Sequence, residues 1–145
     1  MEKVFSSQTF MVRQTVRDTV IEGWANKNII DDAGDRVIPE GVDLTRFEKN
    51  PVIFFNHNPN NIIGKALEWK ITDQGVWIRA RISKSSSSMV AYVRDLIEEG
   101  ILKTFSIGFM PKTMKRGEDG ANHITEWTLD EVSVVSLPCL SLIHI

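Results

Sequence analysis

The sequence predicts an α+β domain built on a strongly curved β-sheet or a small β-barrel. Most of the chain consists of short segments that alternate apolar with polar residues and end at turn-forming residues, which is typical of strands. One longer segment, residues 89–97, carries apolar side chains at helical spacing. The length of 145 residues, 42% hydrophobic and 25% charged, suits one globular domain.

The first half of the chain predicts strands joined by loops. Residues 9–25 predict two antiparallel strands, and residues 26–41, rich in Asp, Gly and Pro, predict a long surface loop. Residues 44–47 predict a short helical turn. The aromatic and β-branched residues 52–55 predict a strand buried on both faces, followed by a polar loop at residues 56–61.

The middle of the chain predicts a hairpin and then a helix. Residues 63–71 and 76–82 predict the two arms of the hairpin, with Gly75 expected to take a positive φ in the turn. Serines 85–88 predict the N-terminal cap of a helix of about three turns, which Gly100 ends.

The remaining elements are strands again. Residues 103–110 predict one strand, which the turn at residues 117–120 joins to a second strand at residues 124–128. Residues 131–137 predict a further strand.

Charge and cysteine content exclude several classes of protein. Seventeen Lys and Arg against nineteen Asp and Glu leave a net charge of -2, without the basic footprint that nucleic-acid binding requires. The single cysteine, Cys139, excludes an internal disulfide, and residues 1–8 lack the apolar core of a signal peptide. Charged or turn residues interrupt every apolar run before it could span a membrane. We therefore expect an intracellular protein that binds neither nucleic acid nor membrane.

Three histidines are the candidate bases for nucleophilic catalysis. His57 is the best placed, at the end of an aromatic strand, because His123 lies in a hairpin arm and His144 at the terminus. Taken alone, a histidine at a strand end is more often a hydrogen-bonded bystander than a catalytic base.

Ser106 lies between bulky apolar residues on a predicted strand, where alternation places it on the solvent face. Gly108, two residues later, marks a bulge or the close approach of another backbone. Glu131 begins an apolar run. It is either an ordinary exposed glutamate at the start of a strand or a carboxylate that lies beside an imidazole. Cys139 fits a small apolar residue better than a nucleophile.

Metal and nucleotide chemistry find no support in the sequence. No Cys or His pair has metal-ligand spacing, and the cluster Asp31, Asp32 and Asp35 lacks the ligand series of a calcium loop. No glycine-rich phosphate-binding loop is present. We therefore expect neither a metal nor a cofactor.

Six segments follow one another over nearly the whole chain: residues 31–41, Pro-Val-Ile-Phe-Phe-Asn-His (51–57), Ile-Gly-Lys (63–65), Gly-Val-Trp (75–77), Phe-Ser-Ile-Gly-Phe (105–109) and Asp-Glu-Val-Ser-Val-Val-Ser-Leu-Pro (130–138). Their order and spacing resemble the prohead protease family of tailed bacteriophages. That family resembles the herpesvirus assemblin proteases, whose fold is a small closed or strongly curved, mainly antiparallel β-barrel with flanking helices and a serine nucleophile on a barrel strand.

The resemblance implies a role for each candidate residue. It makes Ser106 the nucleophile and His57 the general base. It assigns Glu131 to orient His57, with Asp130 as the alternative. It places the oxyanion-hole donors at or beyond Pro138, and it suggests that a barrel edge near Ser106 receives the substrate as an added strand.

The implied reaction is peptide-bond hydrolysis without a cofactor or metal. The implied substrates are the scaffold protein, segments of the major capsid protein and the protease itself, cleaved inside the assembling procapsid in the host cytoplasm. The resemblance leaves open whether the chain forms a homo-oligomer. Two alternatives are an inactive capsid-assembly or scaffolding β domain and an unrelated barrel-like binding module. In the second alternative, Ser106 and His57 need not converge.

The last six residues, 140–145, match the translation of a transposon end used to prepare sequencing libraries. We therefore interpret residues 1–139 as the prohead protease domain, shortened at its C-terminus, and residues 140–145 as not native. The alternative is a genuine apolar strand that ends the domain.

Overall fold

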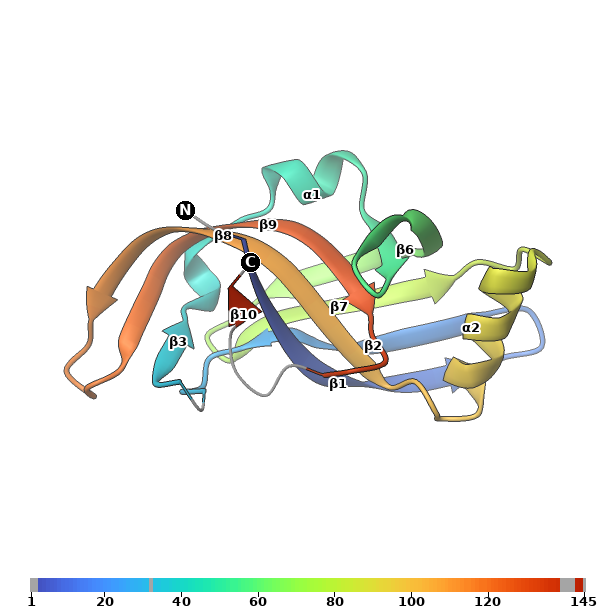
Figure 1. Ribbon diagram of the computed structural model, residues 1–145, viewed down its shortest axis with the longest axis horizontal. Helices are drawn as coiled ribbons and strands as arrows, with labels where there is room; N and C mark the ends of the chain where they lie inside the picture. Colours follow the sequence, from blue (N-terminus) through green and yellow to red (C-terminus); the bar gives the residue numbers. More distant parts are fainter. Residues whose placement is uncertain (1–2, 32, 139–142, 145) are drawn as a thin grey trace.

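In the computed structural model, which describes residues 3–31, 33–138 and 143–144, seven strands close into a barrel. Figure 1 shows how these strands curve around one another. These strands are β1 (Val4–Gln14), β2 (Thr19–Lys27), β5 (Val52–Phe55), β6 (Asn58–Ile71), β7 (Gly75–Ile82), β8 (Thr104–Arg116) and β9 (Asn122–Val134). The ring runs β1, β2, β7, β6, β5, β9, and β8 closes it by pairing with both β9 and β1. Neighbours in this ring are antiparallel except β5 with β9, so the predicted small, mainly antiparallel barrel is confirmed.

The core fills the inside of this barrel with the inward-facing residues of every strand. On β8 the buried apolar side chains are Phe105, Ile107 and Phe109, two residues apart, as a strand requires. Each large side chain of this kind stabilises the fold by about 1.5–3 kcal/mol when it leaves water. The opposite face of β8 is therefore left to position other groups.

The helix α2 (Ser88–Glu98) packs against β6 and β1, and Figure 1 shows it at one end of the barrel. The side chain of Ser87 accepts a hydrogen bond from the backbone of Val90 and so caps the helix, as predicted from the serine run. Gly100 follows with a φ of 76°, a left-handed conformation that suits glycine and ends the helix. No helix in the described ranges is both long enough and apolar enough to cross a membrane.

The predicted loop at residues 26–41 is wrong in part, because it contains regular structure held by β9. β2 continues to Lys27, β3 (Asp35–Val37) pairs with β9 in parallel, and the short helix η1 (Pro39–Gly41) follows. A Cβ on Gly41 would lie 1.8 Å from the carbonyl oxygen of Thr125 on β9, so only glycine permits this approach. Next come β4 (Val42–Asp43), also parallel to β9, and the short helix α1 (Thr45–Lys49), which confirms the predicted helical turn.

Gly75 has a different role from the one predicted. The hairpin of β6 and β7 is confirmed, but the positive φ angles of described glycines occur at Gly34, Gly100 and Gly120. A Cβ on Gly75 would lie 2.1 Å from the carbonyl oxygen of Asn26 on β2. Close approach of a neighbouring strand, rather than the turn, therefore requires glycine here.

At the C-terminus, β10 (Ile143–His144) pairs with Val4 and Phe5 of β1. Cys139 and residues 140–142 and 145 lie outside the described residues. The domain boundary at residue 139 and the origin of residues 140–145 stay predictions.

Candidate active site

The candidate residues meet on the outer face of the barrel, Ser106 and Glu131 from the adjacent strands β8 and β9 and His57 from the turn between β5 and β6. Because Phe105 and Ile107 point into the core, Ser106 points outward from β8. Ser106 pairs with Ser7 of β1 on one side and with Ser133 of β9 on the other. Despite facing outward, Ser106 has no exposed surface, so the prediction of a solvent-facing serine is wrong.

A bulge in β9 turns Glu131 toward this face. The predicted strands at residues 124–128 and 131–137 are one continuous strand, in which Phe109 pairs with Leu129 but Gly108 pairs with Glu131. Asp130 is therefore an extra residue that shifts the alternation by one position. Leu129 and Val132 both point into the core, and Glu131 joins Ser133 on the outer face instead of continuing the inward series.

His57 reaches the site from a tight turn between β5 and β6. The predicted polar loop at residues 56–61 is wrong, because β6 begins at Asn58 and only two residues connect the strands. Asn56 has a φ of 52° and His57 a φ of 58°, the left-handed pair that matches the twist of a two-residue hairpin. The expected burial of β5 on both faces is also wrong, since Ile53 is buried but its neighbours on β5 are partly exposed.

Hydrogen bonds from β9 hold this unusual turn in place. The backbone N–H of His57 donates to the Ser133 side chain at 3.0 Å, and that of Asn56 donates to the Val134 carbonyl at 2.9 Å. The Asn56 side chain accepts from the backbone of Ser136 at 3.0 Å. A left-handed conformation costs a histidine about 1–2 kcal/mol. These hydrogen bonds offset that cost, and the conformation they maintain directs the imidazole ring at the site.

Three side chains form one hydrogen-bonded chain. His57 Nε2 lies 2.8 Å from Ser106 Oγ, and His57 Nδ1 is hydrogen-bonded to Glu131 Oε1. An ionised carboxylate only accepts, so Nδ1 carries the ring hydrogen and Nε2 is free to accept the serine proton. The arrangement can therefore activate a serine hydroxyl for nucleophilic attack.

Glu131 is held in its ionised form. Burial by itself raises the pKa of this carboxyl, but hydrogen bonds from His57 and Lys3 and the charge of Lys3 outweigh burial. The pKa of Glu131 therefore lies below its ordinary value. The carboxylate stays ionised at neutral pH and can stabilise a protonated imidazole.

This pKa predicts how the fold responds to acid. Since the folded pKa of Glu131 is below its ordinary value of 4.5, its stabilisation is present above that value and is lost as the pH falls through the lower folded pKa. We expect the free energy of unfolding, measured with urea, to fall more between neutral pH and about pH 3 in the wild type than in Glu131→Gln.

The contributions of other carboxylates to acid sensitivity cancel when the wild type and Glu131→Gln are compared. Backbone hydrogen bonds from Thr45 and Ala121 lower the pKa of Asp43 and Asp119, and both proteins share these groups. An equal acid sensitivity of the two proteins would contradict the assignment to Glu131.

The other sequence candidates lie elsewhere. The Asp130 carboxylate is 3.4 Å from Arg46, and the His123 ring bonds to Asp119 at the tip of the β8–β9 hairpin. Cys139 lies outside the described residues, and the oxyanion-hole donors expected at or beyond Pro138 stay a prediction. Sequence reasoning missed Lys3, whose ammonium donates to Glu131 Oε2 at 2.6 Å. Nothing in the first residues of the chain signals that contact.

The expected addition of a substrate strand at a barrel edge near Ser106 stays a prediction, but β8 itself offers no free edge there. β8 pairs with β1 and with β9 at this position, so both of its edges are occupied by the barrel itself. A substrate cannot add to β8 as a strand beside Ser106.

Comparisons with known proteins identify the family and the fold of the chain. The sequence model of the family described as caudovirus prohead serine protease matches residues 8–142. The prohead protease of Escherichia phage T5 is 40% identical over 127 residues, and the match covers 82% of this chain but 58% of that protein. The solved structure of the bacteriophage T4 capsid assembly protease shares the fold, with a TM-score of 0.70 at 11% identity over 94% of this chain and 98% of that one. The chain belongs to the caudovirus prohead serine protease family.

Proposed function

We propose that the chain is a serine endopeptidase in which Ser106 is the nucleophile, His57 the general base and Glu131 the residue that orients His57. The observation that carries the proposal is the hydrogen-bonded chain of these three side chains, which come from β8, the β5–β6 turn and β9. Membership of a serine protease family supports the same reaction.

The reaction follows from the positions of the protons. Ser106 Oγ attacks the peptide carbonyl carbon while His57 Nε2 takes the hydroxyl proton, and Glu131 stabilises the imidazolium. The C–N bond breaks as His57 gives this proton to the leaving amine, which leaves an ester on Ser106. A water then attacks the ester carbonyl carbon while His57 takes its proton. The ester C–O bond breaks as His57 gives that proton to Ser106 Oγ, which releases the acid and restores the serine.

The proposed substrates are segments of the scaffold and major capsid proteins, cut within the assembling procapsid in the host cytoplasm. This proposal draws on the relatives, one named a prohead protease and the other a capsid assembly protease. An inactive scaffolding domain is less well supported, because such a domain has no need for a buried serine bonded to a histidine.

The first test is labelling with a fluorophosphonate probe, which reacts with activated serines. We expect the folded protein to be labelled and peptide mass spectrometry to locate the adduct on Ser106. The matched control is Ser83→Ala, whose hydroxyl accepts a hydrogen bond from the backbone of Ser85 rather than from the proposed catalytic residues, and this variant should still be labelled at Ser106. Absence of labelling, or an adduct on another serine, would contradict the proposal.

The second test addresses the substrates. Incubation with the capsid and scaffold proteins encoded in the same genome is expected to give defined fragments, and Ser106→Ala should give none. If the enzyme is labelled by the probe but the capsid and scaffold proteins stay intact, the substrate assignment is wrong and the proposal of a serine hydrolase stands.

A further inference from the structure

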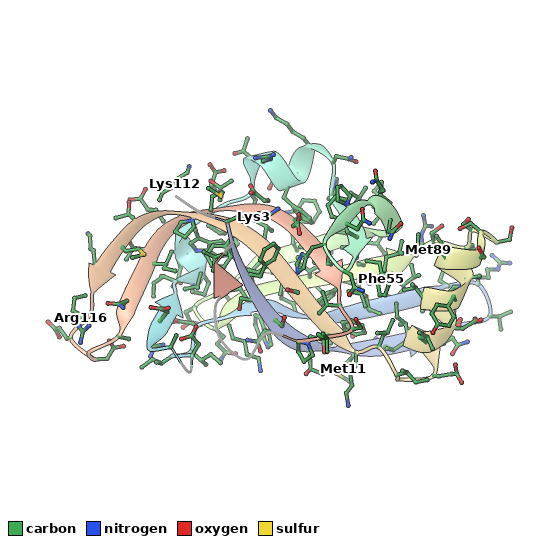
Figure 2. The ribbon with its side chains drawn as sticks, viewed as in Figure 1. Lys3, Met11, Phe55, Met89, Lys112 and Arg116 are labelled. Atoms are coloured by element: carbon green, nitrogen blue, oxygen red, sulfur yellow. The ribbon has the colours of Figure 1, made fainter. Side chains whose placement is uncertain are left out.

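Lys3 lies directly before β1 and reaches the proposed catalytic carboxylate. Its ammonium is 2.6 Å from Glu131 Oε2, with 29% of the Lys3 side chain and 9% of the Glu131 side chain exposed. The other oxygen, Oε1, is bonded to His57. Each oxygen of the carboxylate therefore has its own partner, and the group is held from both sides (Figure 2 shows Lys3 beside β8 and β9).

The backbone leaves space for this contact. A Cβ on Gly108 would lie 2.6 Å from Lys3 Cε and 2.9 Å from Glu131 Cγ. The absence of a side chain at residue 108 thus lets the lysine cross β8 to the carboxylate on β9. The glycine that the sequence analysis singled out has this function in packing.

The same end of β1 also contacts the proposed base. The ring of Phe5, which pairs with Gly108, lies 4.2 Å from the His57 ring between centroids, and the Lys3 ammonium is 5.6 Å from the Phe5 ring. Lys3 and Phe5 therefore pack on Glu131 and His57 from the side of β1.

We propose that Lys3 is a positioning residue, which holds the Glu131 carboxylate in the plane and orientation that His57 requires. This inference rests on the proposed function. A carboxylate bonded to one partner can rotate and exchange its oxygens, whereas a charge-assisted bond on the second oxygen fixes the first against Nδ1. Lys3 itself touches neither the serine nor the imidazole nitrogen.

The test replaces Lys3 while keeping its length. In Lys3→Met, which removes the charge, we expect the rate of fluorophosphonate labelling to fall on the order of 10- to 100-fold, because a hydrogen bond to a charged group is lost. Lys3→Arg restores a cation and should recover part of the rate. The matched control is Lys112→Met on β8, whose ammonium is 3.4 Å from the exposed Asp43 carboxylate, and its labelling rate should not change.

A second measurement does not depend on activity. In the Ser106→Ala background, NMR titration of the Glu131 carboxyl should show that Lys3→Met raises its pKa, because one of the causes that lowers it has been removed. Thermal unfolding of each variant checks that the barrel remains folded. A slower labelling rate together with this upward shift supports the positioning role.

The outcomes separate the two proposals. If the wild type is labelled and folded Lys3→Met is labelled at the same rate, the positioning role is wrong and the proposed function stands. If folded wild type is not labelled at all, the proposed function fails and the positioning role fails with it.

Discussion

Replacing Glu131 with glutamine is expected to lower the labelling rate and the peptidase activity by about 10³- to 10⁴-fold. The reason is specific to this site. Lys3 only donates hydrogen bonds, so the amide oxygen of the glutamine will face Lys3 and the amide nitrogen will face His57. Nδ1 must then accept, its proton moves to Nε2, and Nε2 can no longer take the proton of Ser106. Measured labelling rates for the wild type and Glu131→Gln test this.

Two further variants make this explanation falsifiable. Glu131→Asp keeps the charge with a shorter side chain and should lose less than the glutamine variant. In the double variant Lys3→Met with Glu131→Gln, the amide is free to flip and present its oxygen to Nδ1, so the double variant should be more active than Glu131→Gln alone. Removal of Lys3 would then slow the wild type but accelerate the glutamine variant. A double variant slower than both single variants would show that Lys3 does not orient the group at residue 131.

The barrel could be predicted from the sequence because its strands alternate clearly and its turns carry glycine and polar residues. The α2 helix could also be predicted, since a serine cap, a stripe of apolar residues and Gly100 are local signals. β3 and β4 could not be found in this way. They are two or three residues long, and their pairing with β9 depends on contacts with a segment about 90 residues away in the chain.

The candidate site, like the fold, could be predicted from the sequence only in part. The resemblance, not periodicity, brings Ser106, His57 and Glu131 together, because alternation alone places Ser106 in solvent. The bulge did leave a signal in the sequence. Leu129 and Val132 are both apolar but three residues apart, which breaks the alternation and marks the extra residue.

The turn that presents His57 could not be predicted for a different reason. Asn and Gly are the residues that most often take two successive left-handed positions, and a histidine in the second position carries no turn signal. The conformation exists because Ser133 and Val134 on β9 bond to the backbone of the turn. The strained backbone of His57 therefore persists because bonds from β9 hold the turn, and the turn sets the direction of the imidazole ring.

Replacing Trp127 with alanine is expected to have the largest effect on stability, a loss of about 3–5 kcal/mol in the free energy of unfolding. Trp127 is fully buried on β9, and its ring lies 5.2 Å from that of Phe109 between centroids. Its indole N–H donates to the Ile38 carbonyl at 2.8 Å, which ties the segment between β3 and η1 to the barrel. Urea unfolding measures the loss, and the midpoint of thermal unfolding should fall by about 10–16 °C.

Two matched variants separate the contributions of the ring and the hydrogen bond. Trp127→Phe keeps most of the ring but leaves the Ile38 carbonyl without its donor, so it should lose about 1–3 kcal/mol. Trp77→Ala removes a partly exposed indole that packs beside Lys70 on the hairpin of β6 and β7, and it should cost less than Trp127→Ala. If Trp127→Ala cost no more than Trp77→Ala, the segment from β3 to η1 would not depend on β9 for its position. Its close pairing there, which makes Gly41 necessary, would then need another cause.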